Sequence, residues 1–336
     1  MKYLYCLVFL FISCAQITSL NLKKHQFGRV PLQIVWIQLA GFKPEHLALL
    51  KFEKLEKNSQ TAFEQATCVG HTWEYNLFDI RPQAREGFLS QLTGRSDLKG
   101  ECSDYENQAI WKYLTKQNYK TGIFANTQSG NDFEYAKQCK PEYFDEATVW
   151  LMNRQKDEKS PLFHIDEEKR YKKNTFYYDK SCQQGSCYNS FAKNVIGVHE
   201  QFSRNTPNYL FIVRDQDYEM QIRKNNKKAA SEKLLEVNKV LDYFQKKVEA
   251  NSNLLVLVST SNTMDLNFPK KGNEWRKFKN QNKIYSTKNT KLISTLYASG
   301  ARAENFCGTY SQKEILSRIF SGAKEQGLEF SIINPF

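Results

Sequence analysis

Histidine is scarce in this sequence, which has five histidines among 336 residues and none of them in a metal-binding motif. Internal repeats and long low-complexity tracts are also missing, which argues against a repeat architecture. The apolar run over residues 3–12 is too short to cross a bilayer as a helix. What is present is 40% hydrophobic and 14% aromatic residues, a composition typical of a large folded core.

The first fifteen residues have the pattern of an export signal. Lys2 precedes the apolar run, and small residues follow it. Two cleavage positions fit: before Cys14, which would leave a lipid-modified cysteine, or near Ala15. Membrane attachment would then come only from a lipid on Cys14. We expect an exported protein of bacterial type, periplasmic or anchored in the envelope, with a signal over residues 1–15 and a single domain over residues 30–336.

The formal net charge is +12, and the loss of Lys2 with the signal would lower it by one. Basic stretches lie at residues 167–174, 223–228 and 269–283. Aromatic residues within them would suit nucleic acid, but export argues against that partner. An anionic envelope component or a protein partner fits the expected compartment better.

Six cysteines remain beyond the signal: Cys68, Cys102, Cys139, Cys182, Cys187 and Cys307. An oxidising compartment allows up to three disulfides, and six cysteines permit fifteen full pairings. We expect one pair to be Cys182–Cys187, because Gly185 lets the intervening segment turn back on itself. A metal site there is less favoured, since no second closely spaced Cys or His pair accompanies it.

Buried strands alternate with helices along the chain. Nearly continuous apolar runs predict strands over residues 32–42, 119–126, 208–215, 253–260 and 292–299. Apolar residues at spacings of three and four predict helices over residues 45–58, 105–117, 229–250 and 312–324. This order predicts an α/β fold, a three-layer αβα sandwich with a mainly parallel central sheet.

Two stretches lack this regularity. Residues 127–190 are rich in Lys, Asp, Tyr and Cys and have poor periodicity, which predicts an irregular insertion or cap over the sheet edge. Residues 269–283 read as a basic loop between two strands.

Six segments, in order, resemble motifs of the alkaline phosphatase and sulfatase superfamily. They cover residues 35–42 (VWIQLAGF), 85–95 (REGFLSQLTGR), 110–127 (IWKYLTKQNYKTGIFANT), 209–221 (YLFIVRDQDYEMQ), 254–263 (LLVLVSTSNT) and 297–315 (YASGARAENFCGTYSQKEI). The closing motif and the LTGR helix are the most specific. The resemblance spans about residues 32–125 and 205–322, and it implies an alkaline-phosphatase-like fold.

The resemblance also implies a metal-dependent hydrolase, in which carboxylates and imidazoles bind metal and a hydroxyl attacks phosphorus or sulfur. This sequence departs from that pattern. Ala40 stands where the first metal carboxylate belongs, and Ala84 stands at the nucleophile position. The last Asp-His pair falls on Asn262 and Thr263, and residues 286–291 (STKNTK) contain no final histidine.

The family's remaining Asp, with its His four residues later, falls near Asp215, Asp217 or Glu219. The partner four residues on is then Glu219, Gln221 or Arg223, and never His. These three carboxylates are a candidate residual ligand site. The alternative is that they are solvated loop carboxylates paired with Arg214 or with lysines.

Arg81 and Arg85 flank the former nucleophile position near a helix N-terminus, where guanidinium and N–H groups favour anions. They are a candidate anion-binding pair, and pairing with Asp79 is the structural alternative. His71 and His199 could act as acid or base groups, or they could be ordinary surface or core histidines.

The sequence therefore predicts an exported pseudoenzyme with an alkaline-phosphatase-like fold, acting as a binding or interaction protein without a metal cofactor. The alternative is an active phosphoester or sulfate-ester hydrolase with a rebuilt site. It would use Asp215, Asp217 or Glu219 together with Asp79 or His199, and it would hold zinc or calcium.

Overall fold

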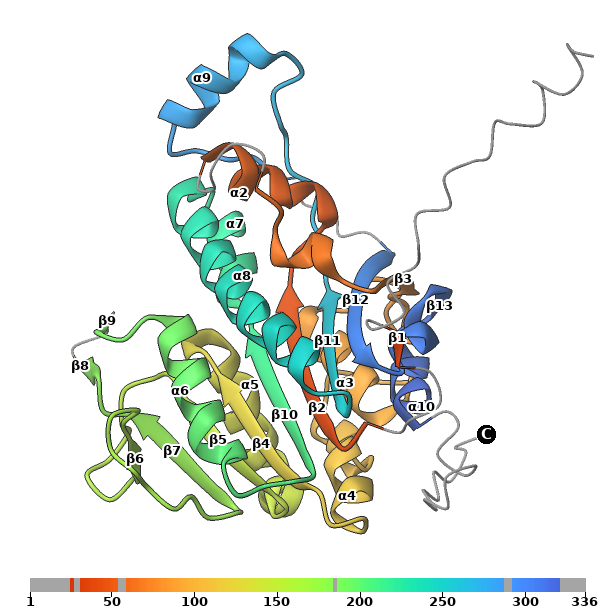
Figure 1. The fold of residues 1–336 in the computed structure, drawn as a ribbon, viewed down its shortest axis with the longest axis vertical. Coiled ribbons are helices and arrows are strands. Elements are labelled where there is room, and N and C mark those ends of the chain that lie inside the picture. The colour runs from red at the N-terminus through yellow and green to blue at the C-terminus, as the bar shows by residue number, and fades with distance from the viewer. Residues whose placement is uncertain (1–24, 27–30, 54–58, 184–185, 287–291, 321–336) are drawn as a thin grey trace, which may run out of the picture.

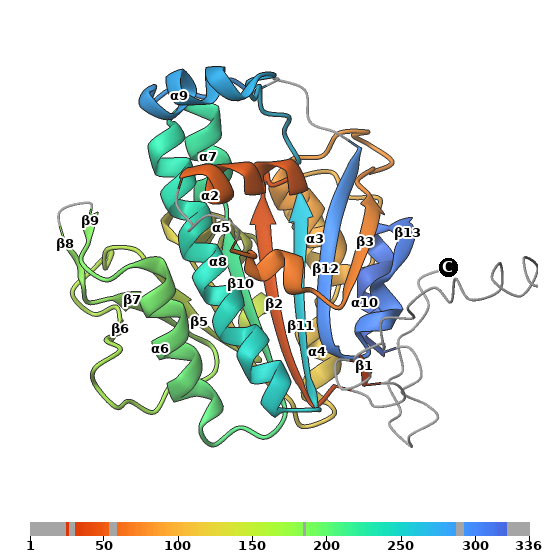
Figure 2. The ribbon, with the colours of Figure 1, turned by 45° about the horizontal axis from the view of Figure 1, so that its top comes forward.

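The protein is a three-layer αβα sandwich built on an 11-stranded, mostly parallel sheet (Figures 1 and 2). The computed structural model describes residues 25–26, 31–53, 59–183, 186–286 and 292–320. The strand order is β13-β3-β12-β11-β2-β10-β4-β5-β7-β6, and β1 pairs with β12 outside this path. The expected fold class is confirmed.

All five predicted strands are present: β2 (Gln33–Ala40), β4 (Lys120–Ala125), β10 (Tyr209–Asp215), β11 (Leu254–Ser261) and β12 (Ile293–Ala301). The first four are parallel, whereas β12 runs antiparallel to β11. The remaining strands of the sheet are β1 (His25–Gln26), β3 (Cys68–Trp73), β5 (Ala147–Leu151), β6 (Leu162–Phe163), β7 (Thr175–Asp179) and β13 (Gly308–Ser311). A separate two-stranded sheet contains β8 (Cys182–Gln183) and β9 (Ser186–Cys187).

Helices cover both faces of the sheet. One core packs α3 (Ala84–Thr93), α4 (Ile110–Thr115), α5 (Thr127–Cys139) and α10 (Ile315–Phe320) against the strands. The opposite core packs α2 (Leu47–Glu53), α6 (Phe191–Ser203), α7 (Asp217–Arg223) and α8 (Lys227–Ala250). Short 3₁₀ turns connect these elements: η2 (Pro44–His46), η3 (Ala62–Gln65), η4 (Cys102–Glu106), η5 (Pro141–Phe144), η6 (Ala303–Phe306) and η7 (Gln312–Glu314).

The predicted helices differ from the observed ones mainly at their ends. The helix expected over residues 229–250 is α8, which begins two residues earlier. The helix expected at residues 105–117 is shortened to α4, and the one at 312–324 begins as a 3₁₀ turn. The last residues of the helices predicted over 45–58 and 312–324, namely residues 54–58 and 321–324, lie outside the described residues. In the described part, no helix is both long and apolar enough to span a bilayer.

The prediction of an irregular insertion over residues 127–190 is wrong. This segment contributes α5 and extends the central sheet, since β5 pairs with β4 and β7 pairs with β5. The strands are short and rich in aromatic residues, and their five-residue length carries little periodic signal. The segment therefore widens the sheet in its own plane.

The prediction of a basic loop over residues 269–283 is also wrong, because this stretch contains α9 (Gly272–Asn280). Trp275 and Phe278 lie on the side of α9 that packs against Phe268, and Phe278 is buried. Trp275 and Phe278 are three residues apart, as on one face of a helix, but the many lysines around them made this pattern difficult to recognise in the sequence.

A row of polar side chains crosses three central strands inside the core. Gln38 on β2 is in register with Arg214 on β10 and with Ser259 on β11. Arg214 is 4% exposed and donates two hydrogen bonds, of 2.9 and 2.7 Å, to Oε1 of Gln38. Gln91 of α3 closes the row, because its Oε1 accepts a 2.6 Å hydrogen bond from the Ser259 hydroxyl. We call these four residues the polar row.

The six cysteines form three disulfides: Cys68–Cys307, Cys102–Cys139 and Cys182–Cys187. The expected pairing of Cys182 with Cys187 is confirmed. It joins β8 to β9, whose two cysteines face each other across the hairpin.

Candidate functional site

A pocket of about 490 Å³ opens beyond the carboxyl ends of β2, β10 and β11. Ligands of open α/β sheets bind at this edge. The pocket is lined by Arg81, Gln83, Ala84, Arg85, Asp132, Gln216, Glu219, Met220, Arg223 and Asn262. Three guanidinium groups and two carboxylates therefore face one polar cavity.

Alanine occupies the two positions where the resemblance calls for a metal carboxylate and a nucleophile. Ala40 ends β2, and Ala84 is the first residue of α3. Their methyl groups pack with Phe88 in a small apolar cluster beside the pocket. A methyl group neither attacks phosphorus nor binds a metal, so the side chains of Ala40 and Ala84 can supply neither function.

Asn262 follows β11 and connects the pocket to two buried carboxyl groups. Its Nδ2 donates a 2.6 Å hydrogen bond to Oε1 of Glu219, and its backbone N–H donates a 2.9 Å bond to Oε2 of Glu74. Its φ of 55° lies in the left-handed region, which asparagine tolerates better than most residues. Thr263 is buried, and its hydroxyl donates to the carbonyl of Ile293. The two residues are thus held by protein groups.

Glu219 lies on α7 and is 8% exposed. Arg223, one helical turn later, donates a 2.6 Å charged hydrogen bond to Oε1 of Glu219. Burial raises the pKa of Glu219, while Arg223 and Asn262 oppose that rise. Gly41 has a φ of +76°, and a Cβ there would lie 2.9 Å from the Glu219 Cβ. This close approach lets the turn after β2 press against α7.

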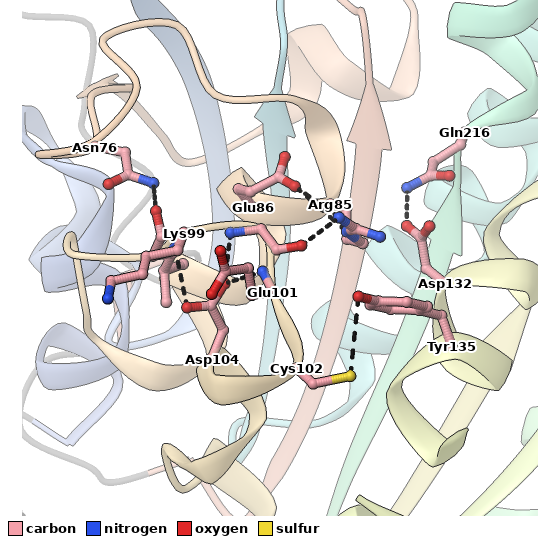
Figure 3. Close-up of polar contacts among 12 residues, drawn as sticks. Asn76, Arg85, Glu86, Lys99, Glu101, Cys102, Asp104, Asp132, Tyr135 and Gln216 are labelled. Carbon is pink, nitrogen blue, oxygen red and sulfur yellow. Dashed lines mark hydrogen bonds and ion pairs between the residues drawn. The ribbon is translucent and has the colours of Figure 1, made fainter. Parts of the chain in front are cut away.

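Arg85 lies at the pocket but is already engaged by the protein, as Figure 3 shows. Its Nη2 lies 3.1 Å from Oε1 of Glu86 and 3.0 Å from the carbonyl oxygen of Gly100. Its guanidinium also stacks 4.6 Å from the ring centroid of Tyr135. Arg81 differs, because its guanidinium has no ion pair with any described carboxylate; the carboxylate of Asp79 accepts only the Arg81 backbone N–H.

Asp215 and Asp217 lie beside the pocket without lining it. Both are buried, so the alternative is wrong in describing them as solvated, whereas the pairing with a lysine that it expected is confirmed for Asp217. Lys233 of α8 approaches Asp217 to 2.9 Å. Burial raises the pKa of Asp215 to about 6; Lys233 opposes this rise and Asp217 adds to it. Of the three candidate carboxylates, Glu219 alone faces the cavity.

The histidines considered as acid or base groups lie elsewhere. His199 on α6 is buried, and its Nε2 lies 3.0 Å from the hydroxyl of Tyr209, the first residue of β10. It therefore sits at the opposite end of the sheet from the pocket. Burial lowers its pKa to about 3. His71 is exposed on β3 and does not line the pocket.

Solved alkaline phosphatases share the fold of this chain. The alkaline phosphatase from the Antarctic bacterium TAB5 aligns with a TM-score of 0.68 at 13% identity, over 88% of this chain and 98% of its own. The cold-active alkaline phosphatase from a psychrophilic Shewanella gives 0.66 at 12% identity, over 86% and 99%. This chain has the alkaline phosphatase fold.

The same fold extends to a more distant structure. The lipoteichoic acid synthase LtaP from Listeria monocytogenes aligns with a TM-score of 0.52 at 13% identity, over 88% of this chain and 73% of its own. No model of a protein family and no curated protein sequence matches the chain.

The donor set at this edge of the alkaline phosphatase fold does not fit a zinc ion. Zinc takes thiolate, imidazole or carboxylate ligands, whereas Ala40, Asn262 and Thr263 offer methyl, amide and hydroxyl groups. Arg223 places a positive charge directly on Glu219. Among the described residues, three potential metal ligands meet only at Asp179, Cys182 and Cys187, where a disulfide consumes both thiolates.

The sequence analysis did not find three residues that line the pocket, namely Asp132, Gln216 and Arg223 as the partner of Glu219, nor Glu74, which contacts the pocket residue Asn262. Glu74 directly follows β3, a strand whose half-exposed alternation was not recognised. Asp132 lies on α5, within the stretch predicted to be irregular, and accepts a hydrogen bond from Gln216 (Figure 3). A strand assignment for residues 68–73 would have placed Glu74 at the correct edge.

Glu74 makes stability depend on pH. Burial raises its pKa to about 8, and its Oε1 has no hydrogen-bond partner among the described atoms. The folded protein thus holds a proton that the unfolded chain releases above about pH 4.5. The stability that this proton supplies is complete below pH 4.5 and is lost as pH rises through 8.

Replacing Glu74 by glutamine is therefore expected to flatten the pH dependence of stability. The difference between wild type and Glu74→Gln in free energy of unfolding should change by about 1.4 kcal/mol per pH unit between pH 5 and 7. Urea titrations at pH 5, 6 and 7 measure this difference. A constant difference across the three pH values would show that Glu74 titrates normally.

Proposed function

We propose that this protein is an exported pseudoenzyme that binds an anionic ligand in the pocket and does not hydrolyse it. The observation that carries the proposal is the cluster of Ala40, Ala84 and Phe88, which places apolar groups where hydrolysis needs a metal ligand and a nucleophile. The pocket itself is intact and polar. A binding function needs the cavity and not the missing chemistry.

The charge of the pocket supports an anionic ligand. Glu219 is neutralised by Arg223, and Asp132 lies close enough to buried Arg214 for that charge to lower its pKa, against the rise caused by burial. Arg81 keeps its guanidinium without a described carboxylate partner at the rim. A phosphate or sulfate group could accept its hydrogen bonds in the bidentate geometry that guanidinium favours.

The bacterial cell envelope is the compartment we propose. Three disulfides support an oxidising environment, since cytosolic proteins rarely keep such bonds. The export signal and the alternative of a lipid on Cys14 fall on residues 1–24, outside the described residues, and stay predictions. The partner would be an anionic envelope component or a protein.

One observation favours the second candidate, a phosphoester or sulfate-ester hydrolase with a rebuilt site. Glu74 holds a proton near neutral pH, as a general acid does. The carboxylates first considered for such a site do not converge, because only Glu219 lines the pocket. Asp79 and His199 do not line it, so this candidate would need a different set of groups, with zinc or calcium bound.

Metal content and anion binding together test the proposal. We expect purified protein to contain far less than one zinc or calcium per chain and to hydrolyse neither p-nitrophenyl phosphate nor p-nitrophenyl sulfate. Inorganic phosphate or sulfate should bind, and Arg81→Gln should weaken this binding about tenfold. Arg204→Gln is the matched control, since Arg204 is exposed on a distant ion pair with Glu168.

Two results would overturn the proposal. Stoichiometric zinc with turnover that chelation abolishes would identify the hydrolase. Anion binding that is equally weak in wild type, Arg81→Gln and Arg204→Gln would show that the pocket holds no anion site.

A further inference from the structure

The region around α9 carries an unusually dense set of free cations. Between residues 269 and 283 the sequence has one carboxylate, Glu274, and six basic residues. All six are exposed, and none has an ion pair with a described carboxylate: Lys270, Lys271, Arg276, Lys277, Lys279 and Lys283. Figures 1 and 2 show α9 projecting at one end of the molecule. We call these six residues the basic patch.

A second unusual feature is the loop that follows β3. Leu77, Phe78 and Ile80 are 71%, 61% and 67% exposed, which is far more apolar surface than four consecutive positions usually show. The loop is nevertheless fixed, because the backbone N–H of Leu77 donates a 2.7 Å hydrogen bond to the carbonyl of Ser96. Asn76 fixes it further by donating to the carbonyl of Leu98 (Figure 3). We call these three residues the apolar loop.

The basic patch and the apolar loop lie at the same end of the sheet. β3 and β11 both run antiparallel to β12, so their carboxyl ends point the same way. The chain leaving β3 contacts the chain leaving β11, because Glu74 accepts the backbone N–H of Asn262. In Figure 2 the loop after β3 and α9 both lie beyond the arrowheads of β2 and β11.

We propose that this end of the protein docks on an anionic lipid bilayer. The basic patch would attract lipid phosphates, and Leu77, Phe78 and Ile80 would enter the interface between headgroups and acyl chains. Clustered cations beside exposed apolar side chains are the combination that such surfaces bind. Phe52, which is 60% exposed and whose ring centroid lies 4.7 Å from that of Trp275, adds apolar surface next to the basic patch.

The apolar loop decides between a membrane and a soluble polyanion. Polysaccharide or nucleic acid would be held by cations alone, with strong salt dependence and no use for Leu77, Phe78 and Ile80. The basic patch and the apolar loop would both strengthen binding to a bilayer, because affinity for lipid increases with buried apolar area as well as with charge. The docking proposal does not depend on the proposed pocket ligand.

Vesicle cosedimentation tests the proposal. We expect the purified protein to bind vesicles with 30% phosphatidylglycerol and to bind pure phosphatidylcholine vesicles much less. Lys271→Gln with Lys277→Gln should weaken binding roughly 25-fold, since each cation near an anionic surface contributes about fivefold. Leu77→Ser with Phe78→Ser should weaken it by a similar factor, since both side chains lose their insertion.

The matched control is Lys116→Gln with Lys120→Gln. These two lysines are exposed, have no ion pair with a described carboxylate and lie near the start of β4, at the opposite end of the sheet. The control should bind as wild type does, and all variants should keep the wild-type melting temperature, because every changed residue is exposed. Equal loss in the control and the basic-patch variant would overturn the proposal, because it would show an effect of net charge alone.

Two further outcomes would also overturn it. Absence of binding to anionic vesicles would do so directly. Binding of heparin that the basic-patch variant loses, with vesicle binding unaffected by changes in the apolar loop, would identify a soluble polyanion as the partner.

Discussion

Replacing Cys68 and Cys307 by alanine is expected to lower the free energy of unfolding by about 5 kcal/mol. The two cysteines are separated by 239 residues, so their bond constrains most of the unfolded chain. Loop-closure entropy grows with the logarithm of that separation. The bond also joins β3 to the residue just before β13, the strand that pairs with β3 at the edge of the sheet.

The Cys182–Cys187 disulfide provides the control. Its cysteines are five residues apart, so the double alanine variant should lose only about 2 kcal/mol. Urea unfolding followed by circular dichroism measures both losses under the same conditions. Equal losses in the two variants would contradict the dependence on loop length.

Replacing Arg214 by alanine is expected to cost about 3 kcal/mol of stability. Its guanidinium is buried, donates both hydrogen bonds to Gln38, and lies 4.9 and 4.5 Å from the ring centroids of Phe88 and Phe133. The alanine variant leaves the Gln38 oxygen without these donors and removes a positive charge that lowers the pKa of Asp132. Thermal and urea unfolding report the loss.

Two variants serve as controls for the stability loss expected of Arg214→Ala. Arg204→Ala removes an exposed arginine whose partner Glu168 is also exposed, and should change stability by less than about 0.5 kcal/mol. Arg214→Lys keeps the charge but lacks the planar fork, and should fall between the two. If Arg214→Ala were as mild as Arg204→Ala, the polar row would contribute nothing to stability.

The central sheet could be predicted because its strands are buried on both faces. The run over residues 254–261 is buried at every position, and such runs are read directly from the sequence. β3 was not predicted from the sequence for the opposite reason. Its residues alternate between buried and exposed, and Gly70 and His71 interrupt the apolar pattern. Edge strands give weaker signals than central ones.

The candidate site was predicted in part. The resemblance selected Ala84 and Asn262, and both line the pocket. It could not supply Glu74 or Asp132, because these residues reach the site from elements whose position depends on tertiary packing. Glu219 and Arg223 stand four residues apart in the sequence, but only the helix α7 turns that spacing into an ion pair.

The polar row has a consequence for how the strands align during folding. Gln38, Arg214 and Ser259 all face the same core, because they occupy matching positions on three parallel strands. A slip of β10 by one residue would turn Arg214 toward the opposite core, where Val35, Ile37 and Phe211 pack without a polar partner. The apolar side chains alone would allow several strand registers. Because burying the unpaired guanidinium of Arg214 costs free energy, only one of these registers is stable.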